Sequence, residues 1–239
     1  MELKNKVAVV TGAGRGIGRQ IALDLAKAGC TVFACARSGD ELESLKRDCT
    51  DAGAPCDYLA ADLSSIANVN LLADRTIERF GRIDILVNNA GVLFQDGVLN
   101  VTEDEWDLTM SVNLKASFFL AQRALKDMMT RRCGYIINMV STAALCVPPG
   151  ITSYGASKAG MVGTSQALYE EAKRHGVKVS MIYPGMTDTG MLRAAGTGTL
   201  PEQWMLPEDI SNCVLFLLKS SDRMVVKEII PWATGHDQI

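Results

Sequence analysis

The chain alternates between short apolar runs and longer stretches in which apolar residues recur every three or four positions. The first pattern is typical of buried strands, and the second is typical of helices with one apolar face. The apolar runs predict seven strands, at 6–12, 30–36, 56–62, 83–91, 134–141, 177–185 and 225–230. Strands that alternate with helices favour a mostly parallel sheet.

Helices are expected between these strands, at 15–28, 41–52, from Ser64 or Ser65 to 80, 102–132, 154–175 and 207–220. Thr102 and Glu105 form a T-x-x-E capping box at the start of the fourth helix, whose pattern allows a break near 111–113. We therefore predict an α/β fold, with one doubly wound parallel sheet of about seven strands and helices on both faces (Rossmann-like). The 239 residues suit a single domain over 1–239.

Composition excludes several classes of partner. Hydrophobic residues make up 48% of the chain and charged residues 21%, and the net charge of −3 gives no reason to expect nucleic acid or an acidic membrane as a partner. No apolar run reaches the roughly 18 residues of a membrane span, and the N-terminus has no signal-peptide pattern, so a cytoplasmic location is expected. Seven cysteines without a C-x-x-C motif are interpreted as reduced packing residues. His175 and His236 lack neighbours at ligand spacing, so no metal site is expected.

A glycine-rich turn, TGAGRGIG (11–18), follows the first strand and opens the first helix. Its glycines, Gly12, Gly16 and Gly18, give G-x-x-x-G-x-G rather than G-x-G-x-x-G, because Ile17 fills the last glycine position of that fingerprint. Small residues still let the backbone approach a pyrophosphate, and a helix N-terminus stabilises its charge. The alternative is a turn that only packs strand on helix. A nucleoside-triphosphate loop is disfavoured because no lysine–serine/threonine pair ends the motif.

The end of the second strand indicates which nucleotide is bound. NAD sites usually place an acidic residue there, but this chain has Arg37 and Ser38, with no carboxylate until Asp40. Arg15, in the glycine loop, could reach the same place. Two guanidinium groups and a hydroxyl suit a 2′-phosphate, so we predict NADP(H) rather than NAD(H). The alternative is a pair of solvated surface arginines.

The segment STAALCVPPGITSYGASK (141–158) carries the candidate chemistry. In a helix, Lys158 lies one turn after Tyr154 and on the same face. A positive neighbour favours phenolate, so we expect the pKa of Tyr154 to fall toward neutral pH, which suits proton transfer to or from an alcohol oxygen. Ser141 could donate a second hydrogen bond to that oxygen. Tyr169 and Lys173 repeat the spacing within YEEAKRH, and we interpret that pair as a solvated helix face.

Together these motifs resemble the short-chain dehydrogenase/reductase (SDR) family over nearly the whole chain. The resemblance implies a catalytic set of Asn113, Ser141, Tyr154 and Lys158, in which Asn113 of SVNLKA breaks its helix and holds a water that links the lysine to solvent. It also implies that Lys158 binds the nicotinamide ribose. Further implied cofactor contacts are Asp62 and Leu63 beside the adenine, Asn89, Ala90 and Gly91 of NNAG beside the adenosine ribose, and Pro184, Gly185, Thr187 and Thr189 around the nicotinamide carboxamide.

The resemblance implies hydride exchange between NADP(H) and a ketone or aldehyde, with Tyr154 as the proton donor or acceptor. The ending VVKEIIPWATGHDQI lacks the family's usual double-glycine turn. It is more similar to the sepiapterin-reductase-like and 3-hydroxy-acid-dehydrogenase-like branch, which argues against a simple 3-oxoacyl carrier-protein reductase. One alternative is a non-catalytic NADP(H)-binding protein that senses redox state or regulates a partner, although such a protein needs no proton donor. Another is a methyltransferase, which leaves the tyrosine and lysine unexplained.

The substrate is expected to be a small molecule in a mostly apolar pocket. Its expected lining is Leu93, Phe94, residues 142–151 and a mobile flap that extends over 187–206 and includes Gly190, Gly196, Gly198, Arg193 and Trp204. Two interpretations of Arg193 are open: it provides a positive charge for an acidic substrate, or it is a solvated surface arginine. An acyl carrier protein, which Arg131-Arg132 and Lys173-Arg174 could contact, stays open but is not favoured. The helices at 103–132 and 154–175 resemble those that build family tetramers, so a homotetramer is favoured over a dimer.

Overall fold

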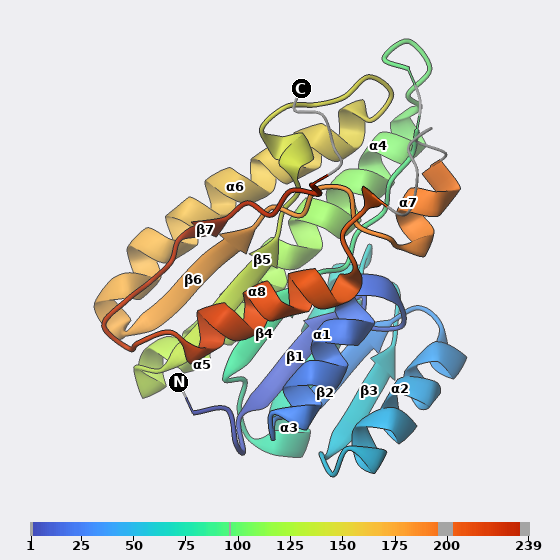
Figure 1. Ribbon diagram of the computed structural model, residues 1–239. Coiled ribbons are helices and arrows are strands. Elements are labelled where there is room, and N and C mark those ends of the chain that lie inside the picture. The colour runs from blue at the N-terminus through green and yellow to red at the C-terminus, as the bar shows by residue number, and fades with distance from the viewer. Residues whose placement is uncertain (1, 96, 196–202, 235–239) are drawn as a thin grey trace.

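The computed structural model describes residues 2–95, 97–195 and 203–234 (Figure 1). In these residues one parallel sheet has the order β3-β2-β1-β4-β5-β6-β7, which confirms the predicted fold class. The strands are β1 (Val7–Thr11), β2 (Thr31–Ala36), β3 (Cys56–Ala60), β4 (Ile85–Asn88), β5 (Gly134–Met139), β6 (Val177–Ile182) and β7 (Glu228–Ile229).

Helices cover both faces of the sheet. They are α1 (Gly16–Lys27), α2 (Gly39–Asp51), α3 (Ile66–Phe80), α4 (Glu103–Thr109), α5 (Ala116–Arg131), α6 (Thr152–Ala172), α7 (Gly190–Ala195) and α8 (Pro207–Lys219). Helices α1, α2 and α8 pack on one face, and α3, α5 and α6 pack on the other (Figure 1). Side chains of a strand point alternately to the two faces, so Val10 joins the first layer and Val9 the second.

Several elements begin or end away from their predicted limits. The strands predicted at 83–91 and 177–185 end at Asn88 and Ile182, because the chain leaves the sheet there and enters the loops at its carboxyl edge. Helix α2 begins at Gly39, earlier than predicted, because Ser38 Oγ caps it by accepting a hydrogen bond from Glu41 N (3.3 Å). Of the predicted flap, 190–195 forms α7, whereas Gly196 and Gly198 lie outside the described residues.

The predicted start and break of the fourth helical region are both confirmed. Thr102 and Glu105 form the capping box, with Glu105 N donating to Thr102 Oγ1 (3.3 Å) and Thr102 N to Glu105 Oε2 (3.2 Å). A π-helical segment at Met110–Lys115 then separates α4 from α5. Such wide turns occur often at functional sites, and this one contains Asn113.

Asp84 organises a buried ion-pair network at the amino edge of the sheet. Its carboxylate is 1% exposed and accepts from Val7 N (2.9 Å), Arg82 Nε (2.8 Å) and Arg131 Nη1 (3.0 Å). Arg131 also pairs with Asp127 at 2.7 Å. This arginine, which sequence reasoning offered for a carrier protein, is therefore engaged in holding α5 to β4.

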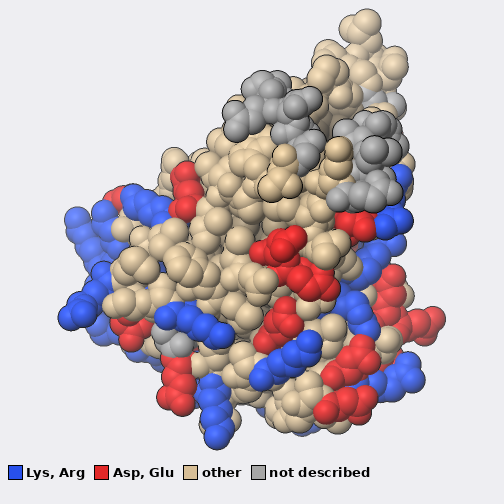
Figure 2. Space-filling model, in the orientation of Figure 1, with Lys and Arg blue, Asp and Glu red and all other residues tan. Residues whose placement is uncertain are grey.

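The surface charges, the helices and the cysteines are relevant to which partners this protein could bind. On the face shown in Figure 2, acidic and basic side chains are interspersed over the lower half, whereas the upper part is mostly uncharged. Within the described residues, no helix is both long and apolar enough for a membrane crossing, and no cluster of three or more histidine, cysteine or acidic side chains could bind a metal ion. All seven cysteines are free, and Cys146 is exposed rather than packed.

Candidate active site

The cleft begins where β1 and β4 lie side by side at the centre of the sheet. The chain leaves β1 toward α1 on one face and leaves β4 toward the helices of the other face. This divergence opens a crevice at the carboxyl edge, the usual binding place in such sheets. Thr11 holds its two sides together, because Thr11 Oγ1 accepts hydrogen bonds from Asn89 N (2.9 Å) and Ala90 N (3.0 Å).

The glycine loop has the shape that a pyrophosphate needs. Gly12 has φ +65°, and a Cβ on it would lie 2.9 Å from Ala90 Cα. Gly16 has φ +56° and begins the 12-residue helix α1, whose N-terminus favours an anion. The backbone therefore passes close to the cleft where side chains would fill the space. These residues fit a dinucleotide.

Most of the predicted cofactor residues line one continuous cavity of about 460 Å³. They are Gly12, Arg15, Gly16, Ile17, Arg37, Ser38, Asp62, Leu63, Asn89, Ala90, Gly91, Tyr154, Lys158, Pro184, Gly185, Thr187 and Thr189. Gly18 is the exception and corrects the sequence prediction. It is buried in α1, where a Cβ would overlap Gly12 O and Asn89 Nδ2, so its role is close packing of α1 on the end of β1.

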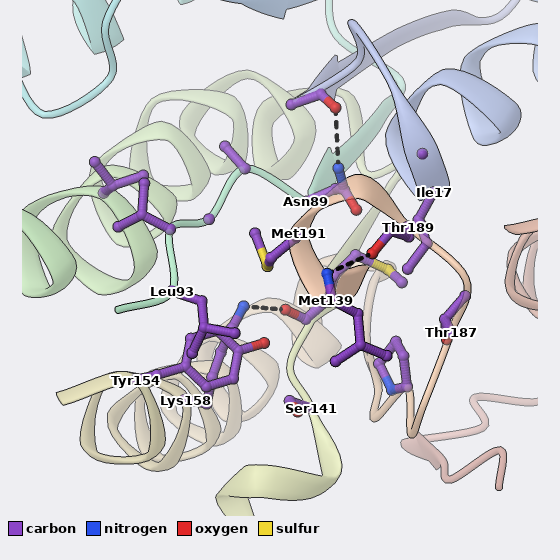
Figure 3. A pocket seen from close by; sticks show the side chains of 18 of the residues that line it. Ile17, Asn89, Leu93, Met139, Ser141, Tyr154, Lys158, Thr187, Thr189 and Met191 are labelled. Carbon is purple, nitrogen blue, oxygen red and sulfur yellow. Dashed lines mark hydrogen bonds between the residues drawn. The ribbon is translucent and has the colours of Figure 1, made fainter. Parts of the chain in front are cut away.

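Tyr154 and Lys158 lie on one face of α6 and line the same cavity (Figure 3). Lys158 Nζ lies 5.6 Å from the centre of the Tyr154 ring, as the one-turn spacing predicts. Lys158 is only 3% exposed, and its Nζ donates a hydrogen bond to Met139 O at the end of β5 (2.7 Å). The second pair has the same separation of 5.6 Å, but Lys173 is exposed and pairs with Glu170. The two tyrosine–lysine pairs therefore differ in the burial of their lysines and not in their spacing.

Burial also changes the proton affinities in a direction that the sequence did not predict. Desolvation raises the pKa of Tyr154 above its usual value, while hydrogen bonding to Ser141 acts in the opposite direction. Desolvation lowers the pKa of Lys158 to about 8. The expectation of a lowered tyrosine pKa is therefore wrong for this structure, because withdrawal from water acts against both charged forms. At neutral pH the phenol holds its proton and can donate it.

Ser141 is positioned by the loop that follows β5. Its Oγ accepts a hydrogen bond from Ala143 N (3.1 Å) and caps the short 3₁₀ turn Thr142–Ala144. Thr142 N donates to Pro184 O (3.2 Å), which ties this loop to the segment after β6. The cavity therefore has Tyr154 and Lys158 on its helix wall and Ser141 on the facing loop (Figure 3).

Asn113 lies behind the cavity wall and is fully buried. Its Oδ1 accepts from Val92 N (2.8 Å), and its Nδ2 donates to Val92 O (3.0 Å) and Ser157 Oγ (3.0 Å). The side chain thus joins the loop after β4 to α6. A Cβ on Gly91 would lie 3.4 Å from Asn113 Oδ1 and 3.9 Å from Lys158 Nζ, so the amide and the ammonium converge at this glycine.

The substrate end of the cavity is mostly apolar, as predicted, but its lining differs in part. Leu93, Cys146, Ile151, Met191 and Leu192 line it, as do the unpredicted Val112 and Trp232. Phe94 and Trp204 do not. Arg193 is exposed and pairs with Asp188 (Nε–Oδ1 2.5 Å, Nη2–Oδ2 2.6 Å), so it offers no cation to the cavity. Glu41, also unpredicted, lines the opposite, nucleotide end of the cavity. Neither Trp232 nor Glu41 belongs to a motif that the sequence displays.

Comparisons with known proteins agree with this architecture. The family model "short chain dehydrogenase" matches residues 6–199. A 3-oxoacyl-[acyl-carrier-protein] reductase of Thermotoga maritima is 30% identical, over 96% of this chain and 97% of its own, and a sepiapterin reductase of Chlorobaculum tepidum is 34% identical, over 97% of each. The crystal structure of a metagenomic short-chain oxidoreductase in complex with NADP superposes with a TM-score of 0.85 and 32% identity, covering 96% and 97% of the two chains. With its parallel sheet, glycine loop and Tyr154–Lys158 cleft, the chain belongs to the short-chain dehydrogenase family.

Proposed function

We propose that this chain is an NADP(H)-dependent oxidoreductase, a single catalytic domain over 1–239 that interconverts a ketone or aldehyde and the corresponding alcohol. The observation that carries the proposal is one continuous cavity, with the glycine loop at one end and Ser141, Tyr154 and Lys158 at the other. A proton donor and a nucleotide-binding loop that share one cavity suit hydride exchange at a carbonyl group.

Bound NADPH would supply a hydride to the carbonyl carbon of the substrate. Tyr154 donates its proton to the carbonyl oxygen, and Ser141 donates a hydrogen bond that orients and polarises the same oxygen. Lys158 carries positive charge at neutral pH, since its pKa is about 8, and it stabilises the phenolate that proton donation leaves behind. Asn113 belongs to a water-mediated path that returns a proton toward Lys158, which its position behind Gly91 supports.

Two observations support NADP(H) as the cofactor. Arg15 and Arg37 are exposed at the cavity lining, and within the described part of the chain neither guanidinium has an ion-pair partner. Free guanidinium groups suit a 2′-phosphate. In addition, the metagenomic relative of known structure is a complex with NADP.

The proposed substrate is a small or acyl-type carbonyl compound, of the sepiapterin- or carbonyl-reductase kind or of the 3-oxoacyl kind. The apolar wall of Leu93, Met191, Leu192 and Trp232 supports an uncharged group beside the reacting carbonyl. A carrier protein is disfavoured, because Arg131 is engaged by Asp84 and Asp127.

The proposal is tested by replacing the proton donor. NADPH oxidation is measured with a panel of ketones, diketones and 3-oxoacyl thioesters, first for the wild type and then for Tyr154→Phe. We expect the variant to bind NADPH as before and to lose about 10²–10⁴-fold in kcat. Tyr169→Phe, in the pair whose lysine is exposed, is the matched control and should retain activity. A Tyr154→Phe variant within tenfold of the wild type would refute the acid–base role. A nucleotide-binding protein that oxidises NADPH with none of the panel would favour the non-catalytic alternative.

We further propose a cytoplasmic homotetramer in which α4, α5 and α6 form contacts between copies. Light scattering on the purified chain distinguishes four copies from two.

A further inference from the structure

The first turn of α2 places a carboxylate at the nucleotide end of the cavity. Glu41 is half-buried and lines the cavity beside Ala36, Arg37 and Ser38. Its side chain lies across the glycine loop: a Cβ on Gly14 would be 3.2 Å from Glu41 Cβ and would overlap Glu41 Oε2. Ala13 N donates to Cys35 O (3.1 Å), so the loop is held beside the end of β2. Gly14 leaves the space that this carboxylate occupies.

The nucleotide end of the cavity therefore carries both positive and negative side chains. Arg15 and Arg37 extend from the glycine loop and from the end of β2, and the Glu41 carboxylate lies between these two segments. Among the described residues, the Glu41 side chain has no hydrogen-bond or ion-pair partner. The side-chain oxygens of Glu41 are thus available to a ligand in the cavity.

A helix-stabilising role does not account for this position. Acidic residues in a first turn interact favourably with the helix dipole, and α2 has two of them, Asp40 and Glu41. Asp40 is exposed and does not line the cavity, so it can serve the helix alone. Glu41 adds a negative charge where the arginines otherwise favour an anion.

We propose that Glu41 weakens the preference for NADPH that the two arginines create, so that this protein uses NADH as well as NADPH. The inference rests on the proposed function and deepens it. A carboxylate repels the 2′-phosphate of NADPH and accepts hydrogen bonds from the 2′-hydroxyl that NADH presents instead. The two arginines favour the phosphate, and Glu41 reduces their preference.

The test compares the two nucleotides in Glu41→Gln and in the control variant Asp40→Asn. Dissociation constants for NADPH and NADH, and kcat/KM with each, are measured for the wild type and both variants. Glu41→Gln should raise the NADPH-to-NADH preference about tenfold, through tighter NADPH and weaker NADH binding. Asp40→Asn should change the preference less than twofold, because it removes the same charge from the same turn outside the cavity. Both variants should unfold at similar urea concentrations, since both lose a first-turn charge.

A preference that changes less than twofold in Glu41→Gln, or equally in both variants, overturns the inference while leaving the proposed function intact. A wild type that binds neither nucleotide overturns the proposed function and the inference together. A wild type that binds NADPH but has no measurable affinity for NADH overturns only the inference.

Discussion

Lys158 should make the nucleotide-free protein less stable than a variant without its charge. The side chain is 3% exposed, and burial lowers its pKa from 10.5 to about 8. At 1.36 kcal/mol per pKa unit, this difference corresponds to about 3 kcal/mol of stability lost at neutral pH. In Lys158→Met a side chain of similar length carries no charge, but Met139 O loses its hydrogen-bond donor, at a cost of about 1 kcal/mol. We expect Lys158→Met to be about 2 kcal/mol more stable than the wild type at pH 7.

The pH dependence of this stability difference shows whether the buried charge of Lys158 causes it. Below pH 8, Lys158 is protonated in both the folded and the unfolded states, so the folded state bears the full cost of the buried charge. Between about 8 and 10.5 the unfolded chain binds more protons than the folded chain, so wild-type stability rises with pH relative to the variant. The advantage of Lys158→Met should therefore shrink through this window and reverse above it, where the wild type should be about 1 kcal/mol more stable because it keeps the hydrogen bond to Met139 O.

Urea unfolding under reducing conditions at several pH values from 7 to 10.5 measures this difference. Lys173→Met is the matched control, because Lys173 has the same separation of 5.6 Å from its tyrosine ring but is exposed. It should change the free energy of unfolding by less than about 0.5 kcal/mol at every pH. If Lys158→Met were less stable than the wild type at pH 7, or if its advantage did not vary with pH, the account of a desolvated ammonium would be wrong.

Two further predictions concern the scaffold. Gly12→Ala should lose about 2–4 kcal/mol of stability and weaken NADPH binding, because φ +65° strains the new residue and its Cβ meets Ala90 Cα at 2.9 Å. Gly53→Ala, with φ +80° and nothing within 4 Å, adds only the strain of about 1 kcal/mol, so equal losses in urea unfolding would contradict the close-approach argument. Asp84→Ala should lose about 3–5 kcal/mol, because it leaves Arg131 and Val7 N without their buried acceptor. Asp127→Ala, which removes a more exposed partner of Arg131, should lose less than about 1 kcal/mol, and the reverse ranking would show that Asp84 is not the centre of the network.

Local patterns determined the elements of this fold. Apolar runs such as VAVVT and helical spacing such as Ile21 to Leu25 depend on residues close together in the chain, and these patterns gave the order of strands and helices. The capping box at Thr102 and Glu105 was predictable for the same reason, because both partners lie within one turn. Boundaries were less certain where the deciding contact came from another segment, as where β4 ends at Asn88 and the chain enters the cleft.

The features of the candidate site also fall into two groups, those set by local sequence and those set by the tertiary structure. The sequence by itself determined that Tyr154 and Lys158 share a helix face and that the glycine loop opens α1, because helix periodicity and turn geometry are local. Only the tertiary structure decided that Lys158 is buried while Lys173 is not, and with that the direction in which the pKa values of Tyr154 and Lys158 move. It also placed Glu41 in the cavity. Desolvation and charge proximity depend on segments far apart in the chain, and no spacing along the sequence encodes them.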